Sequence, residues 1–298
     1  MADLDSYDLP DFGFTPFDQF VIEHWDPESA LSKEEQKETL VRQWLQLGRN
    51  SRDAYHKKTS TPDWVVPEYV PQDLLTDNER RVNGQLGVSN VLWIRTWYGS
   101  GSPAASTSPS SGVSTETAQT DVVSHATADA AYRRLWRAAF FDNDDDPNDD
   151  FDDYRTVHRS FIFDDDPVAY GVTQHTSDEN VAPTGSTPGF IVKAMMHCPD
   201  QLGGFSGGDW SGTEEEYLAT SQNLLVMIAD RKACESGWVL EIGLNHRAEV
   251  LPGRIRSKAS RIATDYGNWQ TEGMALRETT MGEDTETYAQ RGDGWASD

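Results

Sequence analysis

The feature that most constrains this chain is its excess of acidic side chains. Of its 298 residues, 50 are aspartate or glutamate and only 25 are lysine or arginine, which gives a formal net charge of −25. Repulsion among so many like charges opposes a compact state in dilute buffer. In molar salt the Debye length falls to roughly 3 Å, so this repulsion is screened. We therefore expect a fold that forms and persists in concentrated salt.

The choice of basic residue indicates the same solvent. Only 7 of the 25 basic residues are lysines, and the other 18 are arginines. A lysine exposes a long apolar stem for a single charge, which suits a salting-out solvent poorly. In composition the chain resembles the proteins of halophilic archaea and their viruses, a resemblance that names no family. It implies a virion or the cytoplasm of a haloarchaeal host as the location.

High charge is also typical of disordered chains, but the aromatic content argues against disorder here. Ten tryptophans, ten tyrosines and eleven phenylalanines are enough to build a hydrophobic core. No apolar run approaches the roughly 20 residues needed to cross a bilayer, and the acidic N-terminus lacks the apolar stretch of a secretion signal. We expect a soluble, folded protein without a signal peptide or a transmembrane segment.

Changes in composition divide the chain into five segments. Residues 1–31 combine acids, three prolines and isolated aromatics. They form either a disordered end or, as we favour, an extended arm that docks onto the body or a neighbouring subunit. Residues 99–124 have almost no large side chains, which indicates a linker or a long surface loop. Of the rest, 32–98 carries a helix and a strand, 125–262 forms the main α+β body, and 263–298 is a C-terminal tail.

Local patterns predict three amphipathic helices and several strands. Capping boxes begin helices after Ser32 and Thr213, the second of which extends through Ile228, and Thr127 caps another. Apolar and β-branched runs predict strands at 88–98, 157–163, 168–173, 190–196 and 238–242. Because no regular βαβ rhythm is visible, we predict an α+β fold with a mixed, largely antiparallel sheet, three amphipathic helices and extended N- and C-terminal arms.

The most specific local pattern is an acidic run that follows the helix after Thr127. Its oxygen-bearing side chains have the spacing of an EF-hand calcium loop and are Asp142, Asp144, Asp146, Asn148, Asp150 and Asp153. Pro147, however, stands where the sharp turn of such a loop requires glycine. The run is therefore either a calcium site or, as we favour, a hydrated loop decorated by cations. No cofactor is required, and we interpret the later Asp164–Pro167 as a turn.

Catalytic candidates are sparse. His197 and Cys198 adjoin, and together with His246 and Glu249 they are the set from which a thiol-based or dispersed site would be built. Nothing nearby marks the thiol as activated, so its default interpretation is packing. The glycine-rich residues 203–208 match no phosphate-binding motif. A halophilic cytoplasmic enzyme built on these four residues is thus our alternative function, and burial of the thiol among apolar side chains would count against it.

The remaining features favour assembly with other proteins. Acids concentrate in the N-terminal segment and in residues 142–166, whereas arginines gather at 133–137 and 254–261. Few basic residues are available for nucleic acid, so we expect the arginines of 254–261 to pair instead with the acidic surface of a neighbouring subunit or with the chain's own acidic loops. The residues that we predict at a protein interface are Phe12, Phe14, Phe17, Arg254, Arg256 and Arg261.

These observations predict a structural assembly protein of a halophilic system rather than an enzyme. We expect a virion component of a haloarchaeal virus, such as a capsid, neck, tail or baseplate subunit. Its expected partners are copies of itself and other virion proteins, and neither a membrane nor nucleic acid. The motivation is the combination of aromatic-bearing ends, a long Ser/Thr/Gly/Pro-rich segment and no catalytic signature.

Overall fold

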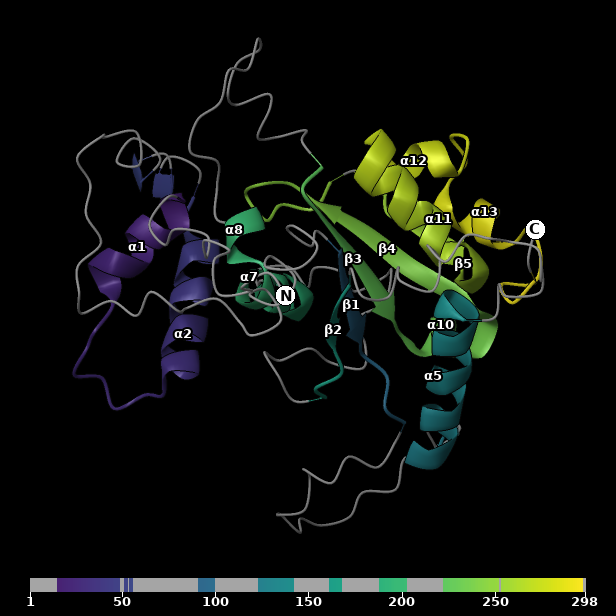
Figure 1. Ribbon diagram of the computed structural model, residues 1–298, viewed down its shortest axis with the longest axis horizontal. Helices are drawn as coiled ribbons and strands as arrows, with labels where there is room; N and C mark the ends of the chain where they lie inside the picture. The colour runs from purple at the N-terminus through teal and green to yellow at the C-terminus, as the bar shows by residue number, and fades with distance from the viewer. Residues whose placement is uncertain are drawn as a thin grey trace, which may run out of the picture.

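The computed structural model describes residues 15–48, 51–52, 54–55, 91–99, 123–141, 161–167, 188–202, 222–251 and 253–296. Within these ranges a five-stranded sheet has helices on both of its faces (Figure 1). The strands are β1 (Val91–Arg95), β2 (Ile162–Asp164), β3 (Leu224–Ala229), β4 (Trp238–Leu244) and β5 (Ile255–Lys258). The predicted α+β class with a mixed sheet is therefore confirmed.

The strands lie in the order β2-β1-β3-β4-β5. Strand β1 is parallel to both β2 and β3, whereas β4 is antiparallel to β3 and to β5. Two of the four pairings are thus parallel, so antiparallel pairing makes up half of the sheet. The parallel pairings follow from the long connections after β1 and β2, because a parallel partner requires a crossover and cannot be reached by a tight turn.

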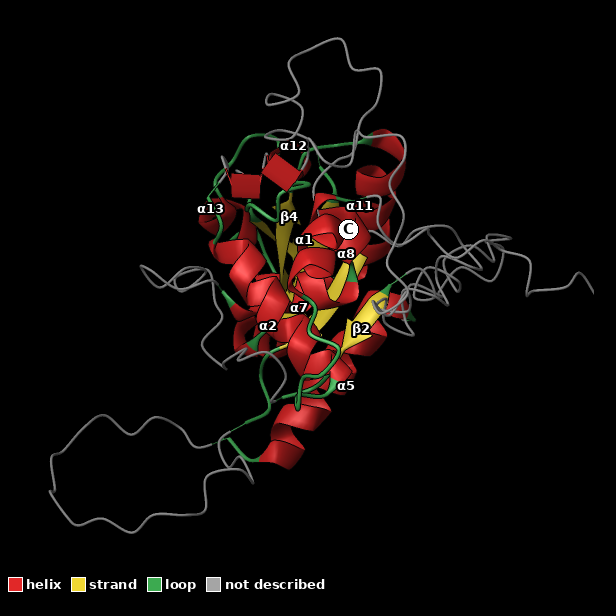
Figure 2. Ribbon diagram, turned by 90° about the vertical axis from the view of Figure 1, so that its left-hand side faces the viewer, coloured by secondary structure: helices red, strands yellow, loops and turns green. Residues whose placement is uncertain are grey.

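The first face of the sheet is covered by α1 (Pro16–His24), α2 (Lys33–Gln46), α7 (Gly189–His197) and α8 (Pro199–Leu202), and α1 and α2 lie toward the viewer in Figure 2. Residues 16–24 are helical because Thr15 and Asp18 form a capping box. Phe17 is 2% exposed and packs edge-on against Trp44, with ring centroids 5.7 Å apart. The predicted arm is therefore not extended over this stretch.

The second face is covered by α5 (His125–Phe140), α10 (Arg231–Ser236), α11 (Ile262–Gly267), the π-helical η6 (Asn268–Glu272) and α12 (Leu276–Thr279). The 3-10 turn η5 (Ala259–Arg261) and α13 (Thr285–Ala289) complete this region. A Cβ atom on Gly243 of β4 would lie 2.8 Å from the ring of Trp269, so this strand position requires glycine. The predicted C-terminal tail is thus mostly short helices that pack on β4 and β5.

Two apolar runs adopt the opposite structure to the predicted one. Residues 190–196, predicted as a strand, lie in helix α7, and the predicted helical residues Leu224 to Ile228 lie in strand β3. Both runs are buried along their whole length, so neither shows the periodicity that distinguishes a helix from a strand. The capping box of Ser32 is confirmed, whereas the cap of α5 is Ser124 and not Thr127.

The ends of the Ser/Thr/Gly/Pro-rich segment lie side by side. Gly99 has a φ of +80°, and a Cβ atom on it would lie 2.8 Å from the carbonyl oxygen of Val123. Strand β1 and helix α5, on either side of the segment, pack in the same hydrophobic core. The intervening chain is thus an insertion within one fold and not a link between two domains.

The predicted helix at Thr213 and the predicted strand at 168–173 lie outside the described residues. Of the predicted strand 157–163, only its last residues are described, and they lie in and beside β2. In the part of the chain that the structure describes, no helix combines the length and the apolar character needed to span a bilayer.

Candidate functional site

The three parallel strands end at the same edge of the sheet, and a charged residue stands at or just after the end of each. These residues are Arg95 in β1, Asp164 in β2 and Asp230 after β3. The crossover from β1 to β2 uses α5 on one face, and that from β2 to β3 uses α7 on the other. Ligands of open α/β sheets bind where successive connections diverge in this way. This carboxyl edge is therefore the first place to expect a functional site.

Asp164 is the centre of a buried polar cluster at this edge. Its Oδ1 accepts a hydrogen bond from Lys193 Nζ at 2.5 Å, and its Oδ2 lies 2.8 Å from His197 Nε2. Lys193, which is completely buried, also donates to the carbonyl oxygen of Asp166 at 2.9 Å. Burial alone would raise the pKa of Asp164, but the bonds from His197 and Lys193 outweigh it and bring the pKa down to about 2. The carboxylate is thus ionised at neutral pH.

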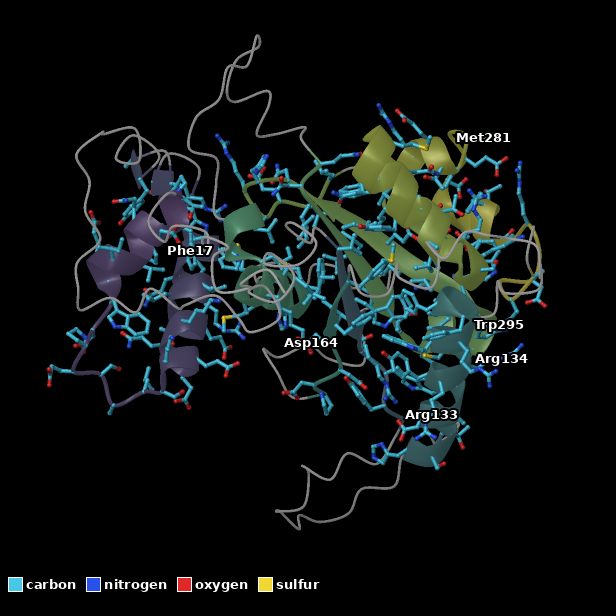
Figure 3. The ribbon with its side chains drawn as sticks, in the orientation of Figure 1. Phe17, Arg133, Arg134, Asp164, Met281 and Trp295 are labelled. Carbon is cyan, nitrogen blue, oxygen red and sulfur yellow. The ribbon has the colours of Figure 1, made fainter. Side chains whose placement is uncertain are left out.

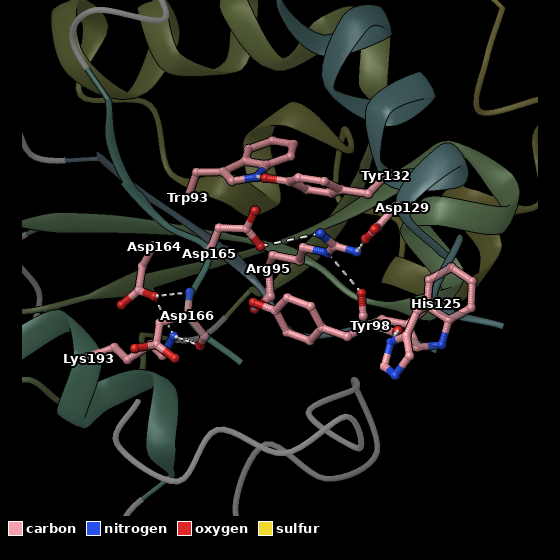
Figure 4. A network of polar contacts seen from close by, with 11 residues as sticks. Trp93, Arg95, Tyr98, His125, Asp129, Tyr132, Asp164, Asp165, Asp166 and Lys193 are labelled. Atoms are coloured by element: carbon pink, nitrogen blue, oxygen red, sulfur yellow. Dashed lines mark hydrogen bonds and ion pairs between the residues drawn. The ribbon is translucent and has the colours of Figure 1, made fainter. Parts of the chain in front are cut away.

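Arg95 forms a second cluster beside the first (Figure 4). Its guanidinium carbon lies 4.4 Å from the ring centroids of both Tyr98 and Tyr132. Nη2 donates to Asp129 at 2.5 Å, and Nη1 lies 3.4 Å from Asp165 Oδ1. Burial, reinforced by the charge of Asp165, raises the pKa of both phenols well above the ordinary tyrosine value. The two rings therefore stay neutral and stack on the cation.

Asp230 holds the third cluster together. It accepts two hydrogen bonds from Arg256, at 3.1 and 2.6 Å, and its Oδ1 also caps α10 through the backbone amide of Ala233. Arg256 donates in addition to the carbonyl oxygen of Trp238 at 2.9 Å. Because its side chain is only 1% exposed, Arg256 has no surface to offer a neighbour. The prediction that it contacts another subunit is therefore wrong.

The charged groups of this edge thus pair with one another within the chain, and these pairs link strands of the sheet to the helices that cover it. Within the described residues, two buried polar atoms there, Thr96 Oγ1 and His197 Nδ1, have no hydrogen-bond partner. Nδ1 is the ring nitrogen of His197 that does not contact Asp164. This pair has the bonding of a general base, but its free nitrogen is buried. The pairs of Asp164 with Lys193 and of Asp230 with Arg256 are buried, whereas Asp129 and Asp165, the partners of Arg95, are about half exposed.

The four predicted catalytic residues are not brought together. Cys198 is 1% exposed in the apolar cluster under α7, and His197 is bound to Asp164. Glu249 accepts a hydrogen bond from Asn245 at 3.1 Å in the turn that also holds His246. That turn follows β4, whose Leu244 pairs with Leu224 at the start of β3, so it lies at the opposite edge of the sheet. The length of the strands separates the two pairs.

The other predicted site residues have varied positions. Phe17 is buried in the chain's own core, which rules out contact with a neighbour, and Arg261 lies 3.7 Å from Asp265 and 3.4 Å from the Tyr288 hydroxyl. Arg254 has an exposed side chain.

Outside the described residues lie Phe12, Phe14 and the proposed calcium ligands Asp142, Asp144, Asp146, Asn148, Asp150 and Asp153. Within the described ranges, no group of three or more His, Cys, Asp or Glu side chains is arranged to hold a metal.

The carboxyl edge was not predicted from the sequence, because we interpreted Asp164–Pro167 only as a turn. Lys193 lies within the apolar run 190–196, for which we predicted a strand. The usable signal was a charged residue at the end of each of several apolar segments. This signal could not reveal the site, because the strand order that brings these segment ends together cannot be read from the sequence.

The outer side of α5 carries a different kind of charge. Arg133, Arg134 and Arg137 are exposed there, and Phe141, directly after the helix, is 47% exposed. We call these four residues the arginine face. Arg134 stacks on the ring of Trp295 with 4.0 Å between guanidinium carbon and ring centroid (Figure 3). Helix α5 has three arginines and a single carboxylate, Asp129, so this surface is basic although the chain as a whole is strongly acidic.

The connection between α1 and α2 has the opposite character. Residues 23–35, which we call the acidic turn, contain one lysine and five exposed carboxylates, namely Glu23, Asp26, Glu28, Glu34 and Glu35. Leu31 lies within this turn and is 49% exposed. The large hydrophobic side chains exposed among the described residues are Leu31, Phe141, Val250 and Met281. Two of these four lie in patches of opposite charge.

Comparison with known proteins gives no relative for this chain: no family model, no curated protein and no solved structure matches it.

Proposed function

We propose that this chain is a structural subunit of an assembly in a halophilic system, of the kind that forms the capsid, neck, tail or baseplate of a haloarchaeal virion. The observation that carries the proposal is the arginine face. It places an exposed basic and apolar surface on a chain whose net charge is −25. The halophilic part of the proposal is supported by composition.

The arginine face has the composition of a protein interface. Arginine and aromatic residues are enriched in such interfaces, whereas lysine is depleted. A guanidinium group is planar and weakly hydrated, so it binds a carboxylate through two hydrogen bonds at low desolvation cost. At contact distance such pairs are screened less than separated surface charges. An arginine surface is therefore suited to association in concentrated salt.

The interpretation of the arginine face as an interface is supported by the contrast between its arginines and the cations buried in the fold. Arg95, Lys193 and Arg256 are each matched to a carboxylate inside the chain and stabilise the sheet. The arginines of α5 lie instead on its outer side, where Phe141 adds exposed apolar area. The alternative of a thiol-based enzyme has less support, because Cys198 is buried, His197 contacts Asp164, and His246 and Glu249 lie at the other edge of the sheet.

The proposal is tested by the oligomeric state in molar KCl, measured by multi-angle light scattering over a range of concentrations. We expect association that increases with concentration and that the double substitution Arg133→Glu/Arg137→Glu abolishes. Arg134 is left intact because it also stacks on Trp295. Arg277→Glu/Arg291→Glu, which changes the net charge equally at two exposed positions on another surface, serves as the matched control. A wild-type chain that stays monomeric at every concentration contradicts the proposal.

A further inference from the structure

The arginine face and the acidic turn lie over opposite faces of the sheet. Helix α5 packs on the face formed by Trp93, Phe161 and Met227, whereas α1 and α2 pack on the face formed by Leu92, Ile94 and Val226. The two surfaces are also well separated in Figure 1, where α1 and α2 stand at one end of the molecule and α5 at the other. They cannot meet within one chain.

We infer that the partner of the arginine face is the acidic turn of a second copy of this chain, so that copies associate head to tail. This inference rests on the proposed function, because it names the occupant of the surface on which that proposal depends. Two features of the surfaces support it, namely their charges and their exposed apolar side chains.

The charges of the two surfaces are complementary. Five carboxylates and one lysine lie on the acidic turn, and three arginines lie on the outer side of α5. Most of the surface of so acidic a chain repels another copy, because like charges that face each other across an interface are strongly unfavourable. The arginine face is a place where a second copy meets opposite charge. Charge thereby selects both the contact and its orientation.

Each surface also presents one large apolar side chain. Leu31 on the acidic turn is 49% exposed, and Phe141 on the arginine face is 47% exposed. Burying the two against each other removes apolar area from water, an effect that salting-out ions strengthen. The contact therefore combines ion pairs, which salt weakens, with an apolar centre, which salt reinforces. Such a contact persists at the ionic strength in which the chain folds.

Local hydrogen bonds within the chain order part of the acidic turn. The backbone amide of Leu31 donates to Ser29 Oγ at 3.2 Å, and Ser32 forms the capping box of α2 with Glu35. Hydrogen bonds from the Ser32 side chain and backbone lower the pKa of Glu35, so this carboxylate is charged at neutral pH. Because little order remains to be imposed on the turn, association there costs less conformational entropy.

A contact between two different surfaces is heterologous. Each copy that binds through its arginine face leaves its acidic turn available to the next copy, so the contact repeats until a ring closes or a filament grows. A two-fold dimer would have to make both reciprocal contacts with the same partner, which two surfaces over opposite faces of the sheet do not allow. The inference therefore predicts species larger than a dimer.

A charge exchange tests the inference in molar KCl. The first variant is Arg133→Glu/Arg137→Glu, and the second is Glu28→Arg/Glu34→Arg, which spares the capping carboxylate Glu35. The first variant gives the arginine face one arginine and two glutamates, and the second gives the acidic turn three carboxylates and three cations. Each variant alone therefore loses the attraction between the two surfaces, and we expect its apparent dissociation constant for self-association to rise at least about 100-fold. In an equimolar mixture the substituted glutamates of the first variant can again meet residues of opposite charge, the substituted arginines of the second. We expect assemblies of wild-type size containing the two variants in a one-to-one ratio.

Two control variants carry the same charge changes on the surface formed by α12 and α13. They are Arg277→Glu/Arg291→Glu and Glu278→Arg/Glu286→Arg, and all four positions are exposed. We expect both controls to associate like the wild type. Near-ultraviolet circular dichroism of every variant establishes that it is folded before its association is measured.

The possible outcomes separate the inference from the proposed function. If the first variant is monomeric but the second associates like the wild type, the head-to-tail inference is overturned while the proposed function stands. The same holds if both variants are monomeric but their mixture does not assemble. A monomeric wild type, or a first variant that associates normally, overturns both.

Discussion

Two regions of the molecule bury a carboxyl group, and they compensate for its burial in opposite ways. Asp164, at the carboxyl edge of β2, is bound by Lys193 and His197, and its pKa is lowered to about 2. Glu241 of β4 is completely buried and faces another acid, Asp265. Its burial, reinforced by the charge of Asp265, raises its pKa well above the ordinary glutamate value. The comparison shows that the partner, and not burial alone, decides which protonation state the fold stabilises.

The surroundings of Glu241 explain why it keeps its proton. Its polar contact is with another carboxyl group, that of Asp265, and a hydrogen bond between two carboxyl groups requires a proton on one of them. The neighbouring Asp265 accepts a hydrogen bond from the Ser257 hydroxyl, and Arg261 approaches it only to 3.7 Å. No basic group is thus as close to Glu241 as Lys193 is to Asp164 within the described residues. The two regions therefore respond to pH with opposite sign.

The largest effect is expected from a substitution in the first region, the cluster around Asp164. Lys193→Met removes the buried ammonium group from Asp164 and leaves that carboxylate with its hydrogen bonds to His197 and to the backbone amide of Asp166. Removing one partner of a buried ion pair costs about 3–5 kcal/mol, and we expect a loss of free energy of unfolding in this range. Chemical denaturation in molar KCl measures it. A loss below about 1 kcal/mol would show that the pair is not buried as the structure places it.

The second prediction concerns acid. The pKa of Asp164 is lower in the folded chain than in the unfolded one, so its contribution to stability is present above the unfolded pKa and is lost as pH falls toward about 2. This contribution is on the order of 2 kcal/mol. Asp164→Asn should therefore lower stability at neutral pH and flatten the loss between about pH 4 and 2. Unfolding curves at several pH values test this prediction. A variant that loses stability between about pH 4 and 2 as steeply as the wild type would contradict it.

The third prediction concerns the second region and has the opposite sign. Because the folded state holds a proton on Glu241 that the unfolded state releases, stability falls as pH rises from the ordinary glutamate pKa toward the raised one. Glu241→Gln removes this ionisable group, so we expect a gain of about 1–2 kcal/mol at neutral pH and a flatter pH profile. Thermal unfolding from pH 5 to 9 measures both. A destabilised variant with an unchanged profile would refute the raised pKa.

The smallest expected effect sharpens the comparison. Arg261 is the cation nearest to the acid pair, and its charge lowers the pKa of Glu241. Arg261→Gln should therefore raise that pKa further and steepen the fall in stability with rising pH. Since Arg261 is partly exposed, we expect a loss of only about 0.5 kcal/mol at neutral pH. Arg277→Gln, at an exposed position of α12, is the control, and equal effects of the two substitutions would argue against a role for Arg261.

Local signals in the sequence predicted several elements correctly. The capping box of Ser32 and Glu35 begins α2, and the apolar stripe that includes Leu135 and Phe140 lies buried on α5. These predictions hold because capping and amphipathic periodicity act within a few residues of the chain. Runs that are buried on every side, such as residues 190–196, carry no such period, and there the prediction of a strand was wrong.

The carboxyl edge was beyond local prediction for a different reason. Asp164 and Lys193 are 29 residues apart in sequence, as the chain runs from β2 to α7, and Asp230 and Arg256 are 26 apart. Nothing local distinguishes a cation that pairs inside the fold from one that stays on the surface. Arg256 was accordingly predicted at an interface, yet it is buried against Asp230, whereas Arg133 lies exposed on α5.

The sequence by itself determined the net charge and the excess of arginine over lysine, from which we predict folding in concentrated salt, because these quantities are sums over residues and do not depend on their arrangement. It also determined the helices whose caps and apolar stripes are local. Only the tertiary structure decided which charges stabilise the fold and which face outward. That choice depends on strand order and register, which bring residues from distant parts of the chain to one edge of the sheet.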